Sequence, residues 1–167
     1  MNILWILAII FAFILVFYVL GYMLLQRVLI REEERILDIF VSKVSKIPAL
    51  IEVMRLHVVD EKAFDDITRL HSESMIQRYD TIYDLLEQNA RIEHEFLFLL
   101  KLSMQIPALQ KHEYFVYIRD FIISYERDMR SRFSLYNHAV DSWNRFIFIK
   151  NSTIIWLILP WMTRTKV

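Results

Sequence analysis

The chain has 167 residues, a length within the range of one domain, and its 20 basic side chains balance its 20 acidic ones. A nucleic-acid-binding protein usually shows a basic excess or a basic face, and neither stands out here. The absence of cysteine excludes disulfides, thiolate metal sites and a cysteine nucleophile. One glycine, Gly21, is too few for glycine-rich phosphate-binding loops, and with three prolines it leaves little turn chemistry for hairpins. We therefore expect an all-α fold.

The first segment in chain order is an uncharged apolar run. No charged side chain occurs in residues 1–26, and residues 3–25 are almost all aliphatic or aromatic. A helix needs about 20 apolar residues to cross a bilayer, whereas a buried core helix rarely stays uncharged for so long. A cleaved signal peptide would carry a basic start and a small-residue cleavage site. We expect residues 1–26 to be an uncleaved transmembrane anchor, with Trp5 and Tyr22 as interfacial aromatics.

The basic residues after this run predict its orientation. They are Arg27, Arg31, Arg35, Lys43 and Lys46, and no basic side chain precedes the run. Because excess Lys and Arg marks the cytoplasmic side, we expect the N-terminus outside and a cytoplasmic helical domain over residues 27–150. The three arginines recur at helical spacing on one face. That face suits either contact with anionic lipid headgroups or ordinary solvation.

Four helical stretches are predicted after the anchor, over residues 27–58, 60–78, 80–105 and 108–148, and the second and third could form one helix. Asp60 suits a helix N-cap, and Pro48 and Pro107 suit a first helical turn or a kink.

Two apolar seams alternate steps of four and three residues along the last two stretches. One seam has positions 79, 83, 86, 90, 93, 97, 100 and 104, and the other has positions 115, 118, 122, 125, 129, 132, 136, 139, 143 and 146. Such seams are typical of long helices packed nearly parallel. We therefore expect an antiparallel, up-and-down four-helix bundle. Glu93 and Arg132 interrupt the seams, which predicts either a partly buried ion pair or a bend of the seam toward solvent.

The C-terminal tail, residues 151–167, is apolar and uncharged as far as Thr163. Such a segment spans only about 20 Å as a helix, which is too short to cross a bilayer. Trp156 and Trp161, followed by Arg164 and Lys166, suit an interfacial foot. The alternative is that the tail packs over the open end of the bundle.

Catalytic and metal-binding patterns are weak throughout the chain. The five histidines form no H-E-x-x-H motif and no E-x-x-H pair of the di-iron bundle type. The serines have no organised base beside them that a sequence can show. We therefore expect no enzymatic activity, metal, cofactor or small-molecule substrate. The alternative is a metal or catalytic site inside the bundle core.

Three short motifs resemble those of the LemA family of bacterial membrane proteins. That family carries an I-P-N-L-V-E segment, then Y-P-x-L, then Y-N-x-x-V-x-x-Y-N. The matching residues are Ile47, Pro48, Leu50, Glu52, Pro107, Leu109, Tyr136, Asn137, Val140 and Asn144. Ala49, Ile106 and Trp143 depart from the pattern, which suggests a divergent member.

The resemblance implies a single-pass protein of the bacterial cytoplasmic membrane, with a short external N-terminus and a cytoplasmic antiparallel four-helix bundle. The family also includes relatives tied to magnetosome membranes, so an organelle membrane is the alternative location. We expect a membrane-anchored scaffold that binds a protein partner or a second copy of itself, besides the lipid bilayer. A membrane-shaping or organelle-building protein is the alternative function. The motif residues would serve helix packing or partner binding.

Overall fold

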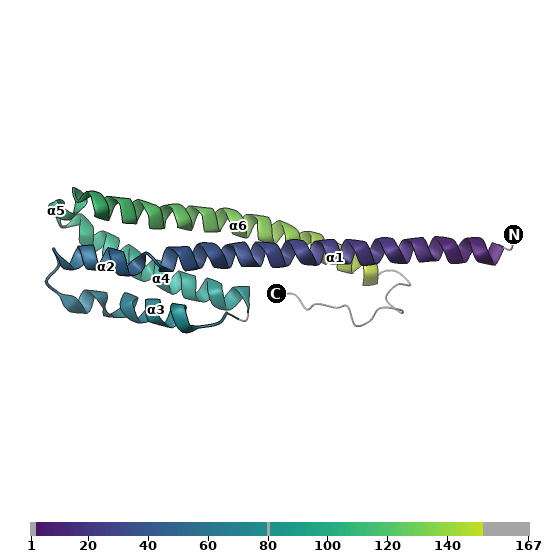
Figure 1. The fold of residues 1–167 in the computed structure, drawn as a ribbon, viewed down its shortest axis with the longest axis horizontal. Helices are drawn as coiled ribbons and strands as arrows, with labels where there is room; N and C mark the ends of the chain where they lie inside the picture. The colour runs from purple at the N-terminus through teal and green to yellow at the C-terminus, as the bar shows by residue number, and fades with distance from the viewer. Residues whose placement is uncertain (1–2, 80, 152–167) are drawn as a thin grey trace. The chain divides into compact units, whose positions relative to one another are not determined.

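The computed structural model describes residues 3–79 and 81–151, and every element within these ranges is a helix. The elements are α1 (Ile3–Val44), α2 (Ile47–Arg55), the short 3-10 helix η1 (Glu61–Phe64), α3 (Asp65–Ile76), α4 (Ile82–Met104), α5 (Pro107–Gln110) and α6 (Glu113–Asn151) (Figure 1). The expected all-α class is confirmed for these residues. The apolar tail with Trp156 and Trp161 lies outside the described residues.

The helix boundaries follow from local capping chemistry. Pro48 lies in the first turn of α2 and Pro107 begins α5, where a missing backbone N–H costs nothing. The carboxylate of Asp60 accepts a hydrogen bond of 3.1 Å from a backbone N–H of η1. Thr81 and Asp84 form a capping box at the start of α4. This cap separates α3 from α4, so the second and third predicted stretches are distinct helices.

The described chain divides into two compact units, and α1 and α6 contribute to both. We call residues 35–132 the central unit. The described residues up to 34 and from 133 onward form the terminal unit.

The central unit contains a core to which each of its longer helices contributes. Its largest fully buried apolar side chains are Ile36, Phe40, Ile47, Leu50, Met54, Phe64, Ile67, Ile92, Leu99 and Phe115. α3 packs beside α2 and α4 (Figure 1). Along α6 the predicted seam is confirmed, since Phe115, Ile118, Ile122 and Met129 are all buried.

The predicted seam of α4 is wrong. Its positions Tyr83, Leu97 and Met104 are exposed. The buried face of α4 comprises Leu85, Gln88, Asn89, Ile92, Phe96, Leu99 and Ser103. α4 has apolar residues on two adjacent faces, and the face turned inward is the one that contains polar residues. Those polar groups are hydrogen-bonded inside the unit, so a count of apolar residues favours the wrong face.

The terminal unit pairs the start of α1 with the end of α6. Three contacts define the pairing: Tyr136 to Glu33, Tyr22 to Trp143, and Tyr18 to Phe146. The first is a hydrogen bond of 3.2 Å, and the other two join ring centroids 5.0 and 4.5 Å apart. Residue numbers rise along α6 as they fall along α1, so the two helices are antiparallel. Inward positions 136, 139 and 143 of the predicted α6 seam are buried here.

Candidate functional site

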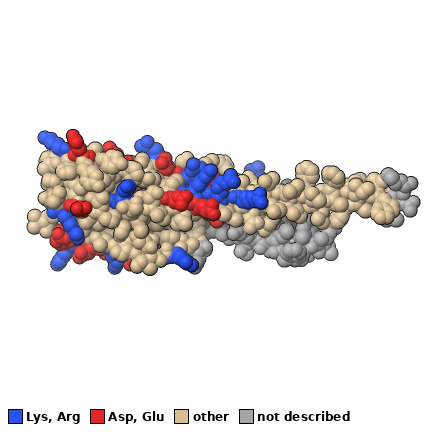
Figure 2. All heavy atoms as spheres, in the orientation of Figure 1, with Lys and Arg blue, Asp and Glu red and all other residues tan. Residues whose placement is uncertain are grey.

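The first half of α1 carries apolar side chains that are exposed. Trp5 and Phe13 are each 67% exposed, and Phe17 is 73% exposed. This half shows no charged side chain, whereas acidic and basic side chains are scattered over the rest (Figure 2). The helix is long and apolar enough to cross a membrane by length and composition. A contiguous apolar surface of this size marks a membrane or protein interaction site.

Three of the basic residues that follow this surface lie on the same helix. Arg27, Arg31 and Arg35 are exposed on α1. Tyr22 is half-buried because its ring packs against Trp143. The described residues that were predicted to lie at a membrane interface all belong to α1. They are Trp5, Tyr22, Arg27, Arg31 and Arg35.

A buried lysine joins three helices of the central unit. Lys43, on α1, is 1% exposed. Its ammonium donates a hydrogen bond of 2.8 Å to Oδ1 of Asn89 on α4, and it forms an ion pair with Glu126 on α6. A buried charge is costly unless it is paired and hydrogen-bonded, and both conditions are met here. Lys43 was predicted only as a basic residue flanking the anchor, so the sequence did not reveal this role.

The same network continues outward to the surface. Arg130 lies 3.9 Å from Glu126 on its own helix and donates a hydrogen bond of 2.9 Å to Glu93 on α4. Glu93, for which the sequence left open an ion pair with Arg132 or a bend of the seam, is paired with Arg130. Arg130 lies two residues earlier on α6, and residues two apart point in different directions from a helix.

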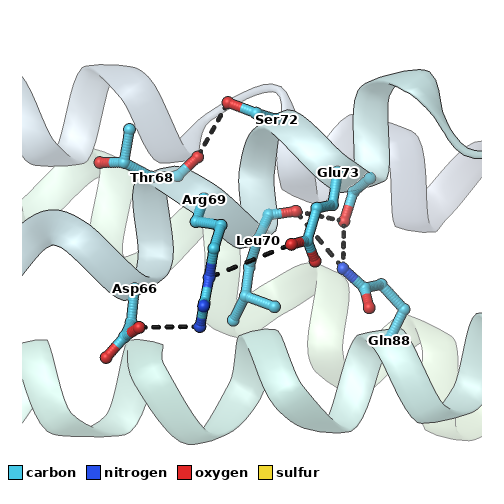
Figure 3. A network of polar contacts seen from close by, with 8 residues as sticks. Asp66, Thr68, Arg69, Leu70, Ser72, Glu73 and Gln88 are labelled. Atoms are coloured by element: carbon cyan, nitrogen blue, oxygen red, sulfur yellow. Dashed lines mark hydrogen bonds and ion pairs between the residues drawn. The ribbon is translucent and has the colours of Figure 1, made fainter.

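A second buried network joins α3 to α4 (Figure 3). The amide nitrogen of Gln88 donates to the Ser74 hydroxyl at 3.0 Å, and that hydroxyl donates to the backbone carbonyl of Leu70 at 2.7 Å. Burial raises the pKa of the nearby Tyr79 phenol, and its interaction with Ser74 opposes this rise. The hydrogen bonds of Gln88 and Ser74 satisfy these two buried side chains and fix the register of the two helices.

A shallow groove of about 340 Å³ lies between α4 and α6 in the central unit. Its apolar lining comes from Phe96, Leu97, Leu100, Ile122 and Ile123. Four charged residues complete the lining: Glu93, Glu126, Arg127 and Arg130. Leu97 belongs to the outward apolar face of α4. The groove therefore combines an apolar floor with charges of both signs.

The motif residues do not gather at one site. Ile47, Leu50, Leu109 and Tyr136 are buried, whereas Pro48, Glu52, Pro107 and Asn137 are exposed, and Val140 and Asn144 are half-buried. The first two motifs belong to the central unit and the third to the terminal unit. The buried members serve helix packing. Glu52 and Asn137 are the exposed members of the set with polar side chains.

No group of three metal-ligating side chains lies together among the described residues. His57 packs edge-to-face on His112, with ring centroids 6.1 Å apart, and Nδ1 of His112 accepts a hydrogen bond from the backbone of Phe115. The two rings thus brace the turn before α6.

Comparison with protein families, with characterised proteins and with solved structures finds no match to this chain. The likeness to the LemA family therefore depends on the short motifs alone.

Proposed function

We propose that this chain is a membrane-anchored helical scaffold. α1 would span the bacterial cytoplasmic membrane, with the N-terminus outside. The central unit would be a cytoplasmic antiparallel four-helix bundle that binds a protein partner and performs no catalysis. The observation that carries this proposal is the exposed, charge-free first half of α1.

The energetics of that surface favour a bilayer as its surroundings. An aromatic side chain such as Phe17 buries on the order of 150–250 Å² when it is covered. Covering such a ring fully contributes roughly 1.5–3 kcal/mol, and correspondingly less where the ring is already partly covered. α1 exposes several such side chains. Hydrocarbon would cover all of them at once, and the basic residues after Gln26 favour the cytoplasmic side for the central unit.

The bundle is supported by the sequence of helices in the central unit. The end of α1 with α2, then α3, α4 and the start of α6 give four helical stretches joined by short turns. Short connections between long helices favour antiparallel neighbours. The LemA-like motifs point to the same architecture, because their buried members occupy helix starts and core positions.

The groove between α4 and α6 is the surface best suited to a protein partner. Its exposed apolar side chains, such as Leu97 and Ile123, would be covered by the apolar face of a partner helix. The charged residues of the lining, Arg127, Arg130, Glu93 and Glu126, would fix the orientation of that helix through charge complementarity.

Photo-crosslinking in native membranes tests this proposal. A photoreactive amino acid at Leu97 should capture a defined protein, and the same residue at Ile76, which is exposed at the end of α3, should not. Adding Ile123→Asp should remove the Leu97 product while leaving the chain folded. Products that contain only a second copy of the chain would replace the partner with a homo-oligomer. Products that contain only lipid would favour a membrane-organising role instead.

A further inference from the structure

We infer that the end of α6, residues 143–148, enters the membrane beside α1, so that an antiparallel helix pair and not a single helix occupies the cytoplasmic side of the bilayer. This inference depends on the proposed span of α1 and extends it to a second element. The occupant of this surface is the lipid bilayer.

The contacts between the two helices set the depth of α6. Phe146 stacks on Tyr18, and Trp143 packs on Tyr22. Both tyrosines belong to the uncharged run over residues 3–25. At 1.5 Å per residue that run measures roughly 35 Å, and the hydrocarbon core takes up about 30 Å of it. Tyr18 lies seven residues, roughly 10 Å, before the end of the run.

Those lengths leave little freedom in placing the bilayer. The uncharged run is about 5 Å longer than the hydrocarbon core is thick. If all of this excess lies at the cytoplasmic end, Tyr18 is still roughly 5 Å inside the hydrocarbon. The ring of Phe146 is at the same level because it stacks on Tyr18. Tyr22 and Trp143 then lie at the interface, where amphipathic aromatic rings are enriched.

Gly21 permits this close pairing. A Cβ atom at position 21 would lie 3.1 Å from the ring of Phe146, which is tighter than ordinary van der Waals contact. Small residues at helix–helix contacts allow close approach in membranes, where packing rather than the hydrophobic effect drives association. The single glycine of the chain thus lies directly against the ring of Phe146 on α6.

The composition of the α6 end suits the same environment. Residues 146–149 are Phe, Ile, Phe and Ile, and Asp141 is the last acidic residue of the chain. The basic residues after it include Arg145, which is exposed and long enough to reach the headgroups from near the interface. Basic side chains without acidic neighbours favour the anionic cytoplasmic leaflet.

The absence of cysteine permits a direct test. Single cysteines introduced as Phe148→Cys, Phe13→Cys and Asp128→Cys would each carry an environment-sensitive fluorophore in the full-length chain. The chain would be reconstituted in phosphatidylethanolamine–phosphatidylglycerol vesicles whose acyl chains carry bromine as a quencher. Position 13 lies in the proposed span, and position 128 is exposed on α6 in the central unit. We expect strong quenching at 13, at least half as much at 148, and none at 128.

The outcomes separate this inference from the proposed anchor. Quenching at 13 without quenching at 148 would overturn the inference and leave the anchor in place. Absence of quenching at both positions would overturn both.

A substitution at the contact between Gly21 and Phe146 provides a second test of the inference. Gly21→Leu places a side chain against Phe146 and should lower quenching at 148 several-fold while leaving quenching at 13 unchanged. Leu20→Ile, an exposed neighbour on α1, serves as the matched control and should change neither signal. Unchanged quenching at 148 in the Gly21→Leu chain would show that α6 does not enter the bilayer through this contact.

Discussion

Two regions of the molecule place their side chains in opposite ways. Before Arg27, α1 exposes aromatic rings such as Phe13 and Phe17, while the central unit buries the ammonium group of Lys43. Both arrangements would be costly in a water-soluble helix. Asn89 and Glu126 satisfy the lysine. The bilayer proposed above would cover the rings.

Under the proposed anchor, the difference means that the exposure of a side chain follows its local surroundings and not the residue type alone. α1 is one continuous helix, so its backbone is the same in both regions. The surroundings change along it: the first rings are largely exposed, whereas Lys43 lies among the polar partners Asn89 and Glu126. Mutations that exchange these properties therefore test the two environments separately.

The largest effect should come from placing charges in the apolar half. The double substitution Phe11→Lys/Ile14→Lys adds two lysines one helical turn apart on α1. Each costs about 2.5–3.5 kcal/mol at the centre of a membrane helix, or roughly 5–7 kcal/mol together. We expect the chain to leave the carbonate-resistant membrane fraction. Phe11→Leu/Ile14→Leu is the control and should stay in it. A double-lysine chain that also stayed would mean that this half does not contact hydrocarbon.

Removal of the buried ammonium should have the next largest effect. Lys43→Met leaves Glu126 partly buried without its main partner, and breaking a buried pair in this way costs about 3 kcal/mol or more. Denaturant unfolding of the full-length chain in detergent would measure this loss. Lys62→Met, at an exposed position of η1, is the matched control and should change stability by less than about 0.5 kcal/mol. Equal stability of the two variants would show that Lys43 is not held as the structure describes.

The corrected face of α4 can be tested with two leucines two residues apart. Leu99→Ala removes a fully buried side chain and should destabilise the chain by about 3 kcal/mol. Leu97→Ala changes a side chain that is 48% exposed and should cost less than about 1 kcal/mol in the absence of a partner. The same unfolding measurement compares them. The reverse order would restore the seam predicted from the sequence.

The sequence predicts most of the helix pattern and one of the two seams. Pro48, Pro107 and Asp60 act locally, so their positions are visible without tertiary information. The α6 seam is correct in that Phe115, Ile118, Ile122, Met129, Tyr136, Ala139 and Trp143 are buried. α4 has two candidate faces, and the choice between them depends on Asn89 meeting Lys43, which is 46 residues away. Such partners are invisible to a periodicity count.

The polar network was missed for the same reason. In the sequence, Lys43, Gln88 and Glu126 look like ordinary polar residues of helices. Only the tertiary structure shows that their side chains make buried polar contacts. The useful signal would have been polar residues recurring at steps of three and four beside Ile92 and Phe96. A helix with two neighbouring stripes, one mostly apolar and one mixed, has two candidates for its inward face.

The smallest predicted effect is a pH dependence that comes from α3. Burial lowers the pKa of His71 below its ordinary value of 6.5. In the interval between the lowered pKa and about 6.5, the unfolded chain binds more protons than the folded chain, so stability falls as the pH falls through that interval. Above that interval the contribution of His71 is fully present. This part of the acid sensitivity should disappear in His71→Gln.

Urea unfolding of the wild type and of His71→Gln between pH 8 and pH 5 would measure the difference. The two chains should be compared by the change in their stability over this interval, which removes any constant effect of the substitution. The wild type should lose more stability than the variant as the pH falls. An equal loss in both chains would place His71 in water and would contradict the half-buried position that α3 gives it.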